Sequence, residues 1–252
     1  MNLPAKLTVK FFNIYFWRQH PETALRYAPV VREINKSGLL DSRILEIGSG
    51  SLGIVPFLKK PIDGVDTDFS GPKTNLLRRI KAKAYDLPFR KNSYDVVISV
   101  DLIEHIEPAL RPRAIYDIVK VAKKLAVIVV PEGEDAENQD KNLRKIYSEV
   151  YNETNQFLEE HVKFGLPKKE QLLITLDKSL RKLNKKAKIR SYPVLNLKVR
   201  YFLMRTYLSK GKFAYYLYLK GYLLLLPFLK LCNFGKCYRR TFVIEFAHEN
   251  RN

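Results

Sequence analysis

The sequence predicts an α/β protein with a doubly wound, mostly parallel sheet and an antiparallel last strand. Two observations lead to this prediction. Short apolar runs of strand length alternate with helical stretches from about residue 41 onward, and a glycine-rich turn directly follows the first run. Such alternation is typical of parallel βαβ units with right-handed crossovers, whose ligands bind at the carboxyl ends of the strands.

The N-terminal part of the chain has a helical pattern over about residues 7–40. We expect breaks near Pro21 and Pro29, and an end at the Ser37-Gly38 pair. The aromatic residues at 11–17 lack the small-residue cleavage site of a secretory signal, so we expect none. This stretch is therefore predicted to be a helical cap.

The remaining elements follow in order. The predicted strands span 43–47, 62–65, 95–100, 126–130, 189–195 and 238–246, and the predicted helices span 52–60, 112–123 and 168–186. A polar segment follows at 131–160. Its acids at 131–140 are expected to border the acceptor site, most of them as solvated loop charges, with metal binding by two of them as the alternative. The last strand alternates enough to be an edge or antiparallel partner.

The length of 252 residues suits one domain, which we divide into four parts. These parts are a helical cap over 1–40, an α/β core over 41–196, a basic and hydrophobic helical insertion over 197–235, and the last strand and tail over 236–252.

The charge and the cysteine content restrict the class of protein. A formal net charge of +19 predicts attraction to polyanions such as nucleic acid, anionic lipid headgroups or phosphorylated substrates, without choosing among them. Cys232 and Cys237 are the two cysteines, and their spacing fits neither a disulfide framework nor a four-ligand zinc site. We therefore expect a cytoplasmic protein.

The string LEIGSGSLG at 45–53 is the first motif that carries chemistry. Its glycines, Gly48, Gly50 and Gly53, lie between a strand and a helix, where backbone approaches a ligand. Asp66 ends the second strand, from which a carboxylate accepts hydrogen bonds from ribose hydroxyls. These features fit nicotinamide, flavin and S-adenosylmethionine equally well.

Further motifs make the chain resemble the class I S-adenosylmethionine-dependent methyltransferases, in particular the branch acting on small molecules and lipids. These motifs are Glu46 before the glycines, Gly-Val-Asp at 64–66, Leu-Pro-Phe at 87–89, Tyr94-Asp95 entering a strand, and Glu104-His105 after it. They occur in family order over about 60 residues. The resemblance implies a Rossmann-like methyltransferase sheet and S-adenosyl-L-methionine as the cofactor.

Carried over by position, the resemblance also implies the residues around the cofactor. Those expected to contact it are Glu46, Gly48, Ser49 and Gly50 at the methionine part, Asp66 and Thr67 at the ribose, and Ala84, Tyr85 and Asp86 at the adenine. Asp101 is a further candidate, which either faces the methionine end of the cofactor or caps the following turn. Lys83 stands where many relatives have an aspartate that binds the adenine amino group. Adenine recognition is then expected to use backbone groups or Asp86.

Methyl transfer needs positioning and removal of the acceptor's proton more than a covalent nucleophile. His105, just past the carboxyl end of the fourth predicted strand, and His161, in the segment expected to roof the acceptor pocket, are the candidate bases. Structural roles in capping or packing are the alternatives for both. We assign no metal, because no His-carboxylate spacing indicates one.

The insertion bears on the acceptor. Residues 193–244 contain ten basic and no acidic residues among many Tyr, Phe and Leu residues. This pattern is typical of a helix lying in a headgroup layer, and a substrate lid packed on the sheet is the alternative. Lys220-Gly221 and Pro227 interrupt the apolar run, so we expect no membrane span.

Three functions therefore stay open. The first is methyl transfer to a small or lipid-like acceptor, such as a quinone, a lipid or a lipid-linked glycan, by a cytoplasmic enzyme attached peripherally to the anionic inner face of a membrane. The second is an RNA methyltransferase, against which no separate RNA-binding module is visible. The third is a cofactor-binding protein without catalysis, or a nicotinamide oxidoreductase. No obligate protein partner is indicated.

Overall fold

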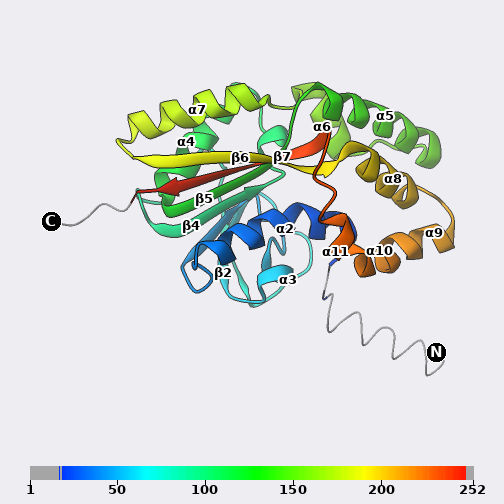
Figure 1. The fold of residues 1–252 in the computed structure, drawn as a ribbon, viewed down its shortest axis with the longest axis horizontal. Coiled ribbons are helices and arrows are strands. Elements are labelled where there is room, and N and C mark those ends of the chain that lie inside the picture. The colour runs from blue at the N-terminus through cyan, green and yellow to red at the C-terminus, as the bar shows by residue number, and fades with distance from the viewer. Residues whose placement is uncertain (1–16, 18, 248–252) are drawn as a thin grey trace.

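The computed structural model describes residue 17 and residues 19–247 (Figure 1). The first part of the helix expected at 7–40, and the expectation that no secretory signal is present, lie outside the described residues.

A seven-stranded sheet forms the centre of the molecule, in the order β3-β2-β1-β4-β5-β7-β6. The strands are β1 (Ile44–Ile47), β2 (Ile62–Asp66), β3 (Leu77–Lys81), β4 (Tyr94–Val100), β5 (Ala122–Pro131), β6 (Ala187–Asn196) and β7 (Cys237–Phe246). The pairs from β3 to β5 are parallel, whereas β7 runs antiparallel to both β5 and β6. The predicted sheet with its antiparallel last strand is confirmed.

Helices cover both faces of this sheet (Figure 1). On one face, α4 (Arg111–Val121) and α7 (Lys169–Lys182) pack through buried residues such as Ile115 and Leu176. On the other face, α2 (Pro21–Lys36) packs through Val30 and Ile34, and α3 (Val55–Leu58) packs through Val55. The central strands are apolar on both sides because both faces are covered.

Helix α2 corrects one expectation. Pro29 lies inside this helix and does not break it, although a proline removes one hydrogen bond of the helical ladder. The neighbouring Val30 and Ile34 are fully buried against the sheet. Burial of this apolar face outweighs the local cost of the proline.

The polar segment at 131–160 is mostly helical, which differs from the loop expected for the acids at 131–140. It contains α5 (Glu134–Tyr151) and the start of α6 (Gln156–Phe164). Asp140 in α5 is fully buried and is not a solvated loop charge. Its partners, described below, come from three other elements.

The insertion before β7 is helical, as expected. Its elements are α8 (Leu197–Tyr207), α9 (Lys212–Tyr216), the π-helical turn η2 (Leu217–Gly221), α10 (Tyr222–Leu224) and α11 (Leu226–Leu229). Its inner side packs Leu203, Leu223 and Leu226 against Ala24 and Leu25 of α2. Within the described residues, no helix has the length and apolar character needed to cross a membrane.

Candidate methyl-transfer site

The glycine-rich loop after β1 adopts a backbone that favours glycine. Gly48 and Gly50 have φ of +77° and +51°. A Cβ atom on Gly48 would come within 2.8 Å of the Leu102 side chain, whereas one on Gly50 would meet nothing within 4 Å. The loop therefore packs closely on one side and leaves open space beside Gly50, where a ligand can approach the backbone.

Asp66 lies at the carboxyl end of β2, next to this loop. Its Oδ2 atom accepts a hydrogen bond from the Gly50 amide at 2.7 Å, and its Oδ1 atom accepts from the Thr67 amide at 2.7 Å. Oδ1 also accepts from the Asp68 amide at 3.1 Å, so Oδ2 is the oxygen that keeps a further acceptor position. The structure thus brings together Gly50, Asp66 and Thr67, three of the residues expected at the cofactor.

The buried side chain of Glu46, in β1, stabilises this loop through hydrogen bonds. This side chain is fully buried, its Oε1 atom accepts from the Tyr27 hydroxyl at 2.8 Å, and its Oε2 atom accepts from the Ile54 amide at 2.7 Å. Burial raises the pKa of Glu46 to about 7. A Cβ atom on Gly53 would lie 2.1 Å from Oε2, so this glycine makes room for the carboxyl group.

The segment expected beside the adenine forms a tight turn. Lys83 and Asp86 pair as an isolated bridge, with Ala84 and Tyr85 between them. This turn follows β3, whose last residue pairs with Asp66 of β2. The turn and Asp66 therefore occupy the same edge of the sheet, and a cofactor contact at 84–86 stays a prediction.

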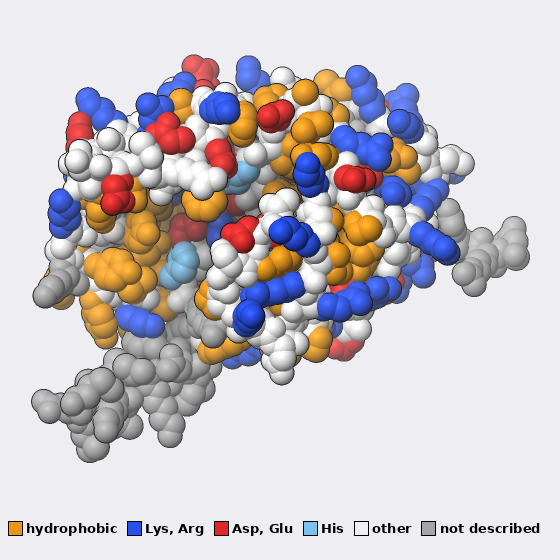
Figure 2. All heavy atoms as spheres, turned by 180° about the vertical axis from the view of Figure 1, so that it is seen from behind, with side chains coloured by type: hydrophobic (Ala, Val, Ile, Leu, Met, Phe, Trp, Pro, Cys, Tyr) orange, Lys and Arg blue, Asp and Glu red, His pale blue; other side chains and the backbone are white. Residues whose placement is uncertain are grey.

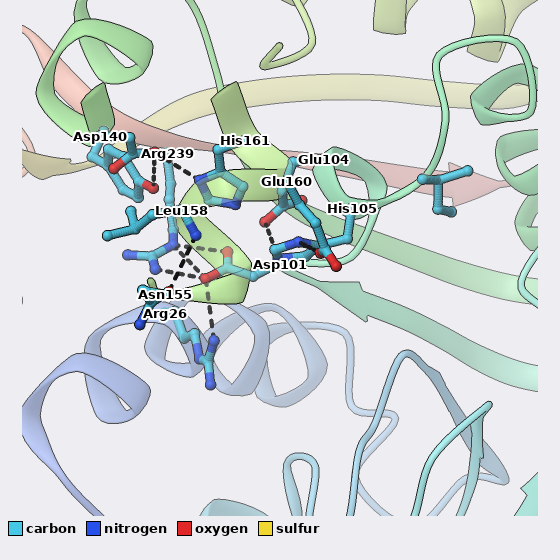
Figure 3. Close-up of polar contacts among 12 residues, drawn as sticks. Arg26, Asp101, Glu104, His105, Asp140, Asn155, Leu158, Glu160, His161 and Arg239 are labelled. Atoms are coloured by element: carbon cyan, nitrogen blue, oxygen red, sulfur yellow. Dashed lines mark hydrogen bonds and ion pairs between the residues drawn. The ribbon is translucent and has the colours of Figure 1, made fainter. Parts of the chain in front are cut away.

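Asp101 follows β4 and is part of a buried ion network. Both of its oxygens accept from Arg239 of β7, with Oδ1 at 2.8 Å, and Arg26 of α2 lies 3.3 Å from Oδ2 (Figure 3). Glu22 also contacts Arg239. Burial would raise the pKa of Asp101, but the charge and hydrogen bonds of Arg239 outweigh it and hold that pKa below its ordinary value.

His105 and His161, far apart in the sequence, lie side by side, with their ring centroids 4.8 Å apart (Figure 3). His105 ends the short 3₁₀ helix η1 (Ile103–His105), and His161 lies in α6. The Nδ1 atom of His105 is 2.7 Å from Glu160 Oε2, and the Nδ1 atom of His161 is 2.8 Å from Asp140 Oδ2. Burial and the neighbouring His161 lower the pKa of His105.

Glu104 completes this group. It is fully buried, and within the described residues neither of its carboxylate oxygens has a hydrogen-bond partner. Burial, and next the charge of Asp101, raise its pKa well above the ordinary value.

Several residues of this region were not foreseen. Asp140 and Glu160 hold the two histidines, and Arg239 holds Asp101. Glu160 precedes His161 in the sequence, which is the one hint of such a role. Arg239 lies in a basic, aromatic stretch that gives no sign that its side chain is buried.

Known proteins provide an independent comparison. Residues 45–130 match the family described as "Methyltransferase domain". No protein with curated annotation matches the chain.

The solved structures include three similar folds. Magnesium protoporphyrin IX methyltransferase from Synechocystis PCC 6803, with bound SAH, has a TM-score of 0.53 at 11% identity and covers 98% of this chain and 96% of its own. A putative methyltransferase from an antibiotic biosynthesis pathway of Anabaena variabilis has a TM-score of 0.50 at 14% identity, covering 87% and 98%. The methyltransferase domain of bacterial CtHen1-C has a TM-score of 0.50 at 12% identity, covering 89% and 98%.

At these identities the structural likeness concerns the fold, and it agrees with the strand order described above. The family match covers β1 through most of β5, including the glycine-rich loop, Asp66 and the Glu104-His105 pair. Residues 45–130 therefore match a methyltransferase domain, and the sheet as a whole has the Rossmann-like methyltransferase fold.

Proposed function

We propose that the protein transfers a methyl group from S-adenosylmethionine to a small or lipid-like acceptor, such as a quinone, a lipid or a lipid-linked glycan, at an anionic membrane surface. One observation carries the proposal: the outward side of the insertion is both apolar and basic. An amphipathic element of this kind can lie in the headgroup layer and bring an apolar acceptor to the site.

The apolar part of this surface is unusually concentrated. Among the described residues, ten of the fourteen exposed large hydrophobic side chains belong to the insertion. We call these ten the insertion face: Phe202, Tyr207, Phe213, Tyr215, Tyr216, Leu224, Leu225, Phe228, Leu231 and Phe234. Phe213 is 80% exposed and Leu231 is 74% exposed, although burial would stabilise them.

The ten basic residues of 193–244 do not all lie at the surface. Arg200 binds buried Asp140, and Arg239 binds buried Asp101, so these two cations belong to the interior. Exposed basic residues remain around the insertion face, namely Lys198, Arg205, Lys210, Lys230 and Lys236. Figure 2 shows Lys and Arg side chains spread over the opposite face of the molecule from Figure 1. Each cation near an anionic membrane contributes about 1 kcal/mol to its attraction.

The residues described above fit the cofactor that the domain implies. The open position beside Gly50 gives room for a ligand, and Oδ2 of Asp66 keeps an acceptor position for a ribose hydroxyl. When bound, S-adenosylmethionine supplies a methyl group attached to a sulfonium. An acceptor atom attacks the methyl carbon in line, and the sulfur leaves with the electron pair of the broken carbon–sulfur bond.

The two histidines are suited to take the acceptor's proton. Carboxylates hold both Nδ1 atoms, which orients the rings and leaves each Nε2 atom for a reacting group. The lowered pKa of His105 favours its neutral, proton-accepting form. We therefore keep His105 and His161 as the proposed bases.

Cosedimentation with liposomes tests the membrane part. We expect the protein to pellet with anionic vesicles and far less with neutral ones. Replacing Phe228 and Leu231 by Ser should weaken this binding, whereas the matched control Ile174→Ser, at a residue 54% exposed on α7, should not. Absence from both pellets, or equal binding by all variants, would remove the membrane part.

Incubation with methyl-labelled S-adenosylmethionine and a fractionated cell extract tests the acceptor. We expect label in the lipid fraction. Label in RNA, with binding that weakens steeply as salt rises, would replace the proposal by an RNA methyltransferase.

A further inference from the structure

Glu104, His105 and His161 form a cluster whose metal-ligating atoms all lie within 4.8 Å of one another. Two imidazoles and one carboxylate form the ligand set of catalytic zinc sites and of mononuclear iron sites. The sequence did not suggest this set, because Glu104 and His161 are brought together only when α6 packs beside η1. Figure 3 shows the three side chains beside Asp101 and the Arg239 network.

The hydrogen bonds of the cluster leave the expected ligand atoms available. Glu160 holds Nδ1 of His105 at 2.7 Å and Asp140 holds Nδ1 of His161 at 2.8 Å, so the Nε2 atom of each ring is the one left to ligate. Such carboxylate–histidine pairs orient the ligands of many metal sites. Asp140 is itself fixed by Arg200 and by the Tyr238 hydroxyl, each at 2.8 Å.

The cluster contains buried polar atoms that have no hydrogen-bond partner, which is unusual for the core of a protein. Glu104 is fully buried and His161 is 6% exposed. Within the described part of the chain, both Glu104 oxygens and the Nε2 atom of His161 have no hydrogen-bond partner. A buried carboxyl group without a partner is costly, and a cation would satisfy all three atoms at once.

From these contacts we infer that Glu104, His105 and His161 bind a divalent transition-metal ion. Ligand atoms of a tetrahedral zinc ion lie about 3.4 Å apart, given metal–ligand bonds of about 2.1 Å. The Nε2 atom of His105 lies 3.8 Å from Oε1 of Glu104. Metal binding therefore requires the ligand atoms, which lie within 4.8 Å of one another, to move closer to that spacing.

The ion has a role that rests on the proposed methyl transfer and takes the place of the two histidines as bases, because an Nε2 atom that binds a metal cannot also accept a proton. Three protein ligands leave coordination positions open, in which the ion can hold an acceptor hydroxyl and lower the pKa of that hydroxyl. The hydroxyl proton passes to solvent, the oxygen forms a bond to the methyl carbon, and the carbon–sulfur bond breaks with its electron pair left on sulfur. The inferred acceptor atom is thus an oxygen.

Titration of the full chain with Co²⁺, after removal of metals with a chelator, tests the site without any acceptor or membrane. We expect one Co²⁺ per chain with visible d–d absorption. The affinity should fall at least about tenfold in Glu104→Gln and His161→Gln, and also in Asp140→Asn, which disturbs an orienting partner. Circular dichroism checks that each variant is folded.

Asp117→Asn is the matched control. Asp117 in α4 is also a carboxylate only 1% exposed whose oxygens accept no hydrogen bond within the described residues, but no histidine joins it in a cluster. We expect this variant to bind Co²⁺ as the unaltered protein does. Absence of Co²⁺ absorption in the unaltered protein, or equal affinity in folded Glu104→Gln and His161→Gln, would overturn the inference. Co²⁺ binding without label in the lipid fraction would remove only the proposed acceptor.

Discussion

The buried carboxyl group of Glu46 should make the stability of the protein depend on pH in a way that one substitution removes. Burial raises its pKa from 4.5 to about 7 in the folded protein. The unfolded chain then ionises at lower pH than the folded protein, so stability falls as pH rises through this window. One pKa unit corresponds to about 1.4 kcal/mol, and the full loss above the folded pKa is about 3 kcal/mol.

Glu46→Gln isolates this effect. A glutamine can still accept from the Ile54 amide and can donate to the Tyr27 hydroxyl, so it mimics the protonated carboxyl group. Urea unfolding at about pH 5 and about pH 8 should show the unaltered protein losing about 2.5 kcal/mol relative to the variant. The same pH dependence in both proteins would refute the raised pKa, because an ordinary Glu46 is ionised across this range in both states.

Two further substitutions test the packing around the site. Gly53→Ala should destabilise the protein clearly more than Gly38→Ala. Both glycines have positive φ, but only a Cβ atom on Gly53 would overlap Glu46. Urea unfolding of both variants measures the difference, and equal losses of unfolding free energy would contradict the prediction. Arg239→Met should cost about 3–5 kcal/mol in unfolding free energy by leaving Asp101 buried with a weaker partner, and a loss below about 1 kcal/mol would show that the network is not stabilising.

The strands at the centre of the sheet could be predicted from the sequence, whereas the edge strand β3 could not. The strands β1, β4 and β5 are apolar runs because both of their sides are buried, and that is a strong signal. Strand β3, with the sequence LRRIK, lies at the edge of the sheet, where exposed basic residues hide the pattern. Helix α5 was missed because few of its residues are apolar, although Asp140 is buried.

The site shows the same division. The glycine loop and Asp66 are contiguous with strands, so their proximity follows from parallel topology. The cluster of Glu104, His105 and His161 depends on the packing of α6 beside η1, and no spacing in the sequence encodes it. The burial of Arg239 likewise follows from the pairing of β7 with β5 and β6.

Calorimetry of cofactor binding tests the central claim most directly. We expect the unaltered protein to bind S-adenosylmethionine and S-adenosylhomocysteine and not to bind NAD. Asp66→Ala should weaken both interactions at least about tenfold, because it removes the carboxylate beside Gly50 whose Oδ2 atom is placed to accept from a ribose hydroxyl. Tight NAD binding with no response to S-adenosylhomocysteine would contradict the assignment of S-adenosylmethionine as the cofactor.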